Sequence, residues 1–142
     1  MKSRFRSWKG VEVLHLDYAN FGSDFPALKA EVLEADGMMT AQRPKSLRVL
    51  IDLRETVASG DVVSFFKESA ARTDPFIQRH ALLGITGIKR FLADKVARLI
   101  GRPMRVFDSE ELALNWLAEG AAPDPDIPDA HVVGLKPGAA RQ

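Results

Sequence analysis

Residues 80–107, HALLGITGIKRFLADKVARLIGRPMRVF, indicate the fold of this chain most directly. The stretch begins with a short apolar run, His80–Ile85, which is typical of a buried strand. A stripe of apolar residues at helical spacing comes next: Ile88, Leu92, Val96 and Leu99. Met104–Phe107 then predicts a second strand. A strand, a helix and a strand in this order join parallel strands by a right-handed crossover, so the stretch predicts an α/β fold.

Toward the N-terminus the chain repeats this alternation. Two more apolar runs, Val11–Asp17 and Leu47–Leu53, predict buried strands. The basic piece Arg4–Trp8 stands before Lys9-Gly10 and could add an edge strand as a hairpin. The expected sheet therefore has four to five strands and is mostly parallel, because helical segments separate the main strands.

Two helices are predicted between these strands. The first follows Pro26, and its apolar stripe consists of Leu28, Val32, Ala35 and Met39. The second has Ser59 and Asp61 as alternative N-caps. Its stripe consists of Val62, Phe65, Phe66, Ser69 and Ala70. Each stripe covers one face, so both helices are expected to pack against the sheet.

A last helix is predicted after residue 107. Asp108 and Glu111 form a capping box, and Phe107 can pack as a staple onto Leu112. The residues expected to face the core are Ala113, Trp116 and Leu117, with Trp116 largely buried. The sequence thus predicts a single-domain α/β fold with a four-to-five-stranded, mostly parallel sheet and four main helices.

The chain divides into a domain, residues 1–120, and a C-terminal tail, residues 121–142. A length of 142 residues fits one domain that buries a core without disulfides or metals. Beyond Gly120 the sequence is rich in Pro and Asp and has no period. We expect the tail to be flexible or draped over a domain that folds without it.

Composition excludes several classes of protein. The formal net charge of +1 is too near neutral for a nucleic-acid binder that relies on bulk electrostatics. Cysteine is absent, which removes disulfides, thiolate nucleophiles and cysteine-bound zinc. No apolar run is long enough for a transmembrane segment, and the basic start lacks the apolar core of a signal peptide. A cytoplasmic location is therefore expected.

No signature of catalysis is present. The three histidines, His15, His80 and His131, stand beside no nucleophile motif and show no metal spacing. His15 is expected to be a packed or hydrogen-bonded strand residue. Gly84–Gly87 lacks both the Walker pattern and the dinucleotide-binding pattern. We expect no enzyme, catalytic residue, metal or cofactor, although a site assembled from residues distant in sequence stays open.

The carboxyl ends of the predicted strands form the first candidate binding region. Loops and helix N-termini converge at this edge of a parallel sheet, where polar residues can contact a small or anionic ligand. The candidates are Tyr18, Arg54, Thr56, Ser59, Thr86 and Gly87. The alternative is that these residues only cap helices and form turns.

The helix predicted over residues 88–99 offers a second candidate surface. Its outer face is mainly positive and includes an aromatic residue outside the apolar stripe: Arg90, Phe91, Lys95 and Arg98. An aromatic ring among basic side chains suits a protein partner or an anionic lipid headgroup. Alternatively, Asp94 pairs with Arg90 and Arg98 on a solvated face, and Phe91 packs under a loop.

Several blocks of the second half of the chain form a family pattern. They are Asp74-Pro75-Phe76, residues 81–89 (ALLGITGIK), Gly101-Arg102 and residues 107–117 (FDSEELALNWL). With Gly10 and Asp17-Tyr18 upstream, the pattern resembles the SpoIIAA-like branch of the STAS superfamily over roughly residues 10–118. The resemblance implies a bacterial, non-enzymatic regulatory or scaffold module that binds another protein or a second copy of itself.

The resemblance also bears on phosphorylation and on lipid binding. In bacterial anti-sigma-factor antagonists of this superfamily, a phosphorylated serine in an Asp-Ser-Ser/Thr-Gly motif controls partner binding. This chain has Ser59-Gly60 without the preceding Asp-Ser pair, so phosphorylation of Ser59 or Thr56 stays open. The branch is also compared with lipid-carrying SEC14 domains, which implies an alternative function: a small carrier of a lipid or other amphiphile. A carrier needs an apolar pocket of roughly several hundred Å³, whereas a docking module can be solidly packed.

Overall fold

The computed structural model describes residues 1–85 and 104–121 as an α/β domain, and residues 86–103 and 122–142 lie outside the described part. The elements are β1 (Arg4–Trp8), β2 (Val11–Asp17), α1 (Phe25–Met39), β3 (Leu47–Asp52), α2 (Gly60–Thr73), the 3-10 turn η1 (Asp74–Phe76), β4 (Ile77–Leu83), β5 (Met104–Phe107) and α4 (Glu110–Ala118). Among the described residues there are thus three α-helices, not the four predicted for the chain. The predicted helix over residues 88–99 and the tail beyond Ala121 lie outside them.

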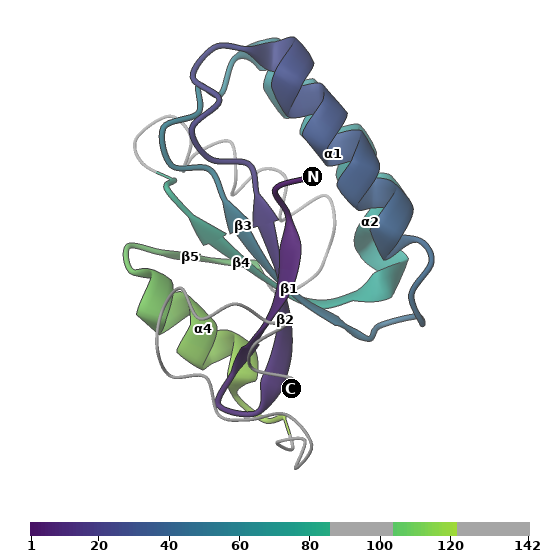
Figure 1. Cartoon of the computed structure of the whole chain (residues 1–142), viewed down its shortest axis with the longest axis vertical. Coiled ribbons are helices and arrows are strands. Elements are labelled where there is room, and N and C mark those ends of the chain that lie inside the picture. Colours follow the sequence, from purple (N-terminus) through teal and green to yellow (C-terminus); the bar gives the residue numbers. More distant parts are fainter. Residues whose placement is uncertain (86–103, 122–142) are drawn as a thin grey trace.

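The strands form one five-stranded mixed sheet in the order β1-β2-β3-β4-β5 (Figure 1). β2, β3, β4 and β5 pair in parallel, whereas β1 pairs antiparallel with β2. The prediction of a mostly parallel sheet is therefore corrected to a mixed one. The cause is the Lys9-Gly10 turn, in which the two residues have φ of 50° and 77°. A two-residue turn with positive φ at both positions matches the twist of a hairpin, so it returns the chain beside β2. The suggested edge strand is confirmed.

Strand boundaries agree with the predicted ones at β2 and β5 and differ at β3 and β4. β3 ends at Asp52 rather than Leu53. β4 covers Ile77–Leu83 rather than His80–Ile85, since its pairing with β3 already begins at Ile77. It stops before Gly84, whose φ of 84° takes the backbone out of the extended region.

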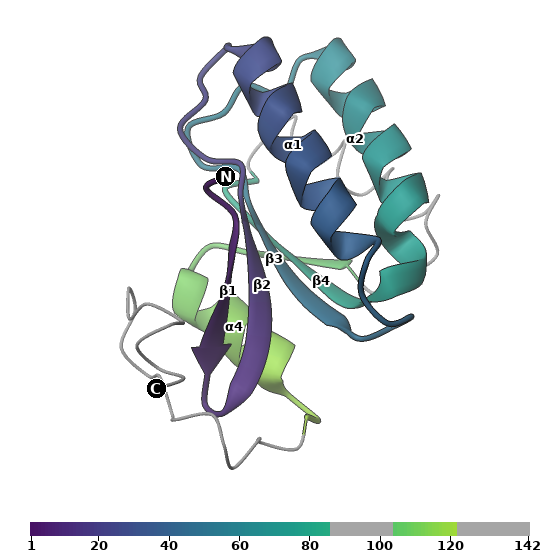
Figure 2. The same ribbon diagram turned by 45° about the vertical axis from the view of Figure 1, so that its right-hand side comes forward.

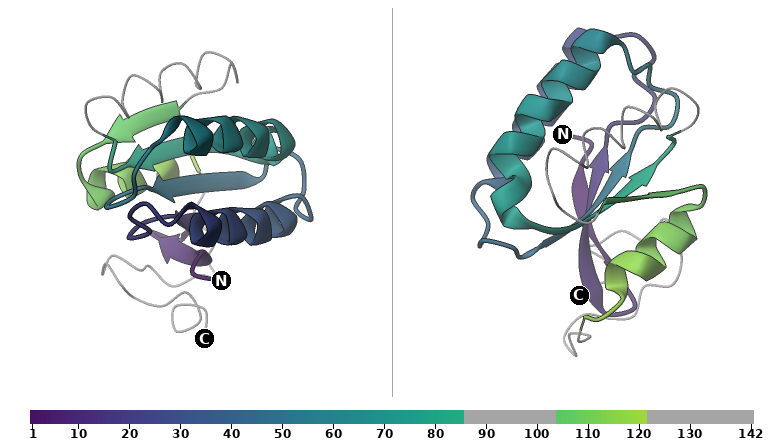
Figure 3. Two further views of the ribbon diagram at one scale, coloured as in Figure 1. Left: turned by 90° about the horizontal axis from the view of Figure 1, so that it is seen from above. Right: turned by 180° about the vertical axis from the view of Figure 1, so that it is seen from behind.

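Helices cover both faces of the sheet (Figures 1 and 2). α1 and α2 lie side by side on one face, and α4 lies on the opposite face, as the view from above also shows (Figure 3). The core under α1 and α2 includes Leu16, Val32 and Val49. The core under α4 includes Trp8, Leu50 and Leu114. The sheet therefore separates two packing layers.

The predicted face of α1 is confirmed, and that of α2 is confirmed in part, since Val62, Phe65 and Ser69 are buried while Phe66 and Ala70 are half-buried. Leu28, Val32, Ala35 and Met39 of α1 are buried. Ser59 is the N-cap of α2, and its side chain accepts a hydrogen bond of 3.3 Å from the Val62 backbone N–H. Of the two alternative caps in the sequence, Ser59 is thus the one that forms.

α4 differs from its prediction at both its start and its buried face. Ser109, not Asp108, is the N-cap and accepts from the Leu112 N–H. Leu112 is 58% exposed, so the predicted staple with Phe107 is wrong. Trp116 is only half-buried, because it lies against β5 at the sheet edge, where Arg79 and Arg105 cover its ring. Leu114 is buried together with Ala113 and Leu117.

In residues 1–85 and 104–121, none of the helices has the length and apolar character needed to cross a membrane.

Candidate functional site

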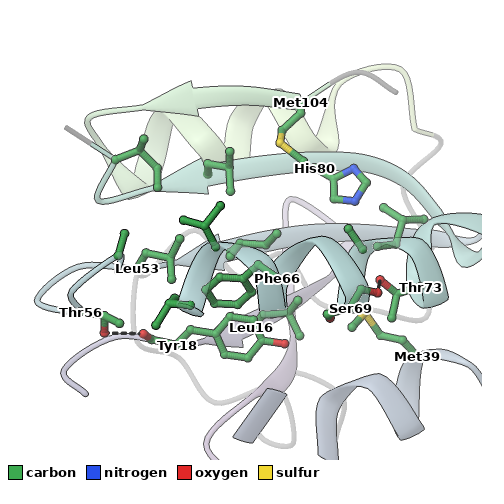
Figure 4. Close-up of a pocket in the computed structure, with 18 of the residues that line it drawn as sticks. Leu16, Tyr18, Met39, Leu53, Thr56, Phe66, Ser69, Thr73, His80 and Met104 are labelled. Atoms are coloured by element: carbon green, nitrogen blue, oxygen red, sulfur yellow. Dashed lines mark hydrogen bonds between the residues drawn. The ribbon is translucent and has the colours of Figure 1, made fainter. Parts of the chain in front are cut away.

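A cavity of about 110 Å³ lies between α2 and the sheet (Figure 4). Most of its wall is apolar and comes from β2, β3, β4, α2 and the loop between β3 and α2. Its larger apolar side chains include Leu16, Ile51, Leu53, Phe66 and Leu82. Among the described residues, Ala58 and Ala70 also line it, and their small side chains leave more room there than larger ones would.

The volume of the cavity limits what can occupy it. About 110 Å³ is well below the roughly several hundred Å³ that a lipid or drug-sized ligand needs. It is close to the volume of an engineered apolar cavity of about 150 Å³ that binds benzene. The cavity therefore suits a compact apolar molecule rather than a long acyl chain.

Tyr18 places the most distinctive polar group in the cavity wall. Its side chain is 2% exposed, and its ring lies 5.7 Å from that of Phe66. The backbone holds it in place, since the Tyr18 N–H donates to the Asp52 carbonyl at 3.0 Å. Within the described residues the phenolic oxygen has no hydrogen-bond partner. A buried hydroxyl in this state is poised to bond to a guest molecule or to water.

Burial raises the pKa of Tyr18 well above its ordinary value, and the negative charges of Asp36 and Glu31 raise it further. The phenol therefore stays protonated at neutral pH and can donate a hydrogen bond.

Thr56, a second sequence-based candidate, also lines the cavity, but its hydroxyl is already hydrogen-bonded to the backbone. The Thr56 Oγ1 donates to the Tyr18 carbonyl at 2.7 Å and accepts from the Phe21 N–H at 3.2 Å. The residue is only 4% exposed. Thr56 thus fixes the backbone around Tyr18 rather than offering a group to a ligand.

A buried polar cluster joins α1 to α2 beside the cavity. Ser69, which lines the cavity, donates to Asp36 at 2.7 Å, and Arg72 donates to the other oxygen of Asp36 at 2.7 Å. Asp36 is 5% exposed, so these partners compensate the burial of its charge.

Arg54, a third candidate, lies on the α4 side of the sheet, in a ring of five charged or titratable residues. Arg54 donates to both oxygens of Asp52, at 2.9 and 2.7 Å, and to Glu110 at 3.2 Å. Glu110 also lies 3.5 Å from Arg6, which contacts His15 at 3.1 Å. The Nε2 of His15 closes the ring at 3.4 Å from Asp52. The prediction that His15 is a packed, hydrogen-bonded strand residue is confirmed.

The pKa of Asp52 reflects this ring. Burial by itself would raise the pKa, but the His15 ring 3.4 Å away and the hydrogen bonds from Arg54 outweigh it and hold the pKa far below the usual range.

His15, Asp52 and Glu110 bring ligand-type atoms within 4.8 Å of one another, which raises the question of a metal. A guanidinium only donates, so Arg6 makes the Nδ1 of His15 an acceptor and leaves the ring proton on Nε2. That nitrogen is then not available to a metal ion, and Arg54 already occupies both oxygens of Asp52. The ring suits internal charge pairing better than cation binding.

The structure thus separates the sequence-based candidates. It brings Tyr18 and Thr56 together at the cavity and places Arg54 on the other face of the sheet. Ser59 is exposed and caps α2. The other candidates, Thr86, Gly87, Arg90, Phe91, Lys95 and Arg98, lie outside the described residues. Sequence reasoning missed the cavity-lining residues Ser69, His80 and Met104, and the ring residues Arg6 and Glu110. No signal in the sequence marks Arg6, because nothing in the piece Arg4–Trp8 distinguishes the exposed Arg4 from the buried Arg6.

Comparison of the chain with family models, with curated proteins and with solved structures found no match. The STAS resemblance therefore stays a prediction.

Proposed function

We propose that this chain is a non-enzymatic, STAS-like binding module that takes one compact apolar molecule into the cavity between α2 and the sheet. The cavity itself supports the proposal, because protein interiors are normally packed without voids of this size. The wall of this cavity is mostly apolar, and apolar surface gains free energy when a guest displaces water from it. A ligand that fills the cavity would obtain part of that gain.

The position of Val57 supports access to the cavity from solvent. Val57 lines the cavity and is 53% exposed, so the loop between β3 and α2 is where the lining meets the surface. A ligand would have a short path past this loop.

Docking on a protein partner, the other function expected from the sequence, stays a prediction. Its proposed face, with Arg90, Phe91, Lys95 and Arg98, lies outside the described residues. The exposed large apolar residues of the described part are Met1, Leu33, Val57 and Leu112. They belong to different elements, so they do not by themselves define a docking surface.

Filling the cavity tests the proposal. Ala70→Leu adds three carbon atoms at the cavity wall, while Ala71→Leu makes the same change at an exposed position of α2. We expect toluene to raise the Tm of the wild-type chain and of Ala71→Leu but not of Ala70→Leu. Toluene that stabilises none of the three proteins, or all of them equally, would contradict the proposal.

A further inference from the structure

The phenolic oxygen of Tyr18 is a hydrogen-bonding group left unused at the cavity. In Figure 4 the Tyr18 ring lies beside Phe66, and its hydroxyl points toward the side of the cavity where Ser69 lies. The oxygen is buried and has no hydrogen-bond partner within residues 1–85 and 104–121. A buried hydroxyl without a partner is unfavourable, so a ligand that supplies an acceptor gains binding free energy there.

Neighbouring hydroxyls in the cavity wall are already committed. Thr56 donates to the Tyr18 carbonyl, and Ser69 donates to Asp36. Neither can donate to a ligand without giving up its present bond. Thr73 donates to the Ser69 carbonyl, so among the hydroxyls of the described wall the one left to donate is that of Tyr18; the ring of His80 is a further polar group of this wall.

Charge near Tyr18 disfavours an anionic guest. Asp36 and Glu31 act on the phenol strongly enough to raise its pKa beyond the effect of burial. Asp36 is itself paired with Arg72, which leaves no free cation of that pair for a carboxylate or phosphate. An anion would lose its hydration on entering a cavity whose described wall is mostly apolar.

We propose that Tyr18 gives the cavity its selectivity, for a neutral, compact apolar molecule with one hydrogen-bond acceptor, such as an alcohol, phenol or carbonyl oxygen. This inference rests on the proposed function, because it presumes that the cavity takes up a ligand. It predicts that fatty acids and other anionic amphiphiles bind this cavity more weakly than neutral molecules of the same size.

Three probes that share a benzene ring distinguish apolar burial, hydrogen bonding to Tyr18 and the effect of a negative charge. They are toluene, phenol and benzoate. Dissociation constants are measured by NMR titration of the full chain at neutral pH, for wild type and for Tyr18→Phe. Toluene should bind both proteins alike. The ratio of the phenol to the toluene dissociation constant should rise about tenfold in Tyr18→Phe, the equivalent of one hydrogen bond. Benzoate should bind wild type at least about tenfold more weakly than phenol.

Each outcome has a distinct meaning. If neither toluene nor phenol binds the wild-type protein, both the proposed function and this inference are refuted. If both bind and the ratio is unchanged in Tyr18→Phe, the role of Tyr18 is refuted while the cavity remains a binding site. Benzoate that binds as tightly as phenol refutes the selection against anions.

A second measurement needs no variant. The chain contains a single tyrosine, so a ¹³C label at Tyr Cζ reports on this hydroxyl alone. Phenol should shift the Cζ signal more than toluene does, because only phenol bonds to the hydroxyl. Equal shifts with the two ligands would overturn the inference even if Tyr18→Phe did not fold.

Discussion

Asp52→Asn should destabilise the protein more than any conservative change to a surface carboxylate. The Asp52 side chain is 4% exposed and accepts three hydrogen bonds from Arg54, at 3.1 Å from the backbone and at 2.9 and 2.7 Å from the guanidinium. An asparagine of the same shape presents an amide N–H₂ to either Arg54 or the Nε2–H of His15, both of which are donors. Breaking a buried pair costs about 3–5 kcal/mol. Because the Arg54 side chain is 49% exposed, solvent screening reduces our expectation to about 2–4 kcal/mol.

The assay is chemical and thermal unfolding, with a neighbouring aspartate as the control. Asp17 pairs with Asp52 in the register of β2 and β3, but its ion pairs with Lys2 and Arg4, at 3.5 and 3.7 Å, are solvent-accessible. Asp17→Asn should therefore cost less than about 1 kcal/mol. Asp52→Asn should lower the Tm by roughly 5–15 °C. If the two variants lose equal stability, the ring of charges does not hold the structure together as argued.

The direction of the Asp52 pKa shift determines how the folding stability depends on pH. The pKa of Asp52 is lowered in the folded state, so its stabilisation is present above the unfolded pKa of about 3.9 and is lost as pH falls toward the folded value. The difference in stability between wild type and Asp52→Asn should stay constant between about pH 8 and pH 5 and shrink only in stronger acid.

Two more predictions concern a glycine and a buried glutamate. Gly84→Ala should lower the free energy of unfolding by at least about 2 kcal/mol, because φ is 84° and the new Cβ would lie 2.5 Å from the backbone nitrogen of Arg54. Gly37→Ala in α1, where a Cβ meets nothing within 4 Å, should instead stabilise by up to about 1 kcal/mol in the same urea titration. Burial would raise the pKa of Glu31, yet the backbone N–H groups of Lys2 and Ser3, each 2.9 Å away, lower it overall. Glu31→Gln should therefore cost about 1–2 kcal/mol at pH 7, and the difference should shrink as pH falls below the ordinary glutamate pKa of about 4.3; a difference that grows on acidification contradicts this assignment.

The sheet and the first two helices could be predicted from sequence because their signals are local. The apolar stripe of α1 repeats at helical spacing, and every member of it is buried. The N-cap of α4 was predicted one residue too early, because Asp108 and Ser109 are both good caps at adjacent positions. The Lys9-Gly10 turn is another local signal, but it became decisive only once both residues were seen to adopt positive φ.

The candidate site was only partly accessible to such reasoning. Tyr18 and Thr56 follow from the rule that ligands bind at the carboxyl ends of parallel strands. The cavity does not follow from any pattern, because an unfilled volume depends on how α2 and the sheet meet in three dimensions. The charged ring is likewise built across elements, since Arg6 lies in β1 and Glu110 begins α4. A sequence does not say what such residues contact.

The two faces of the sheet differ in how firmly their helices are held. α4 is anchored at its start, where Glu110 pairs with Arg6 and Arg54, and at its end, where Arg48 and Arg79 donate to its last carbonyl groups. Within the described residues, α2 instead borders the cavity along part of its inner face. Side chains next to a void can adjust at lower cost than those in a filled core. A guest molecule would therefore be accommodated by a shift of α2 and the loop before it, while the layer of α4 stays fixed.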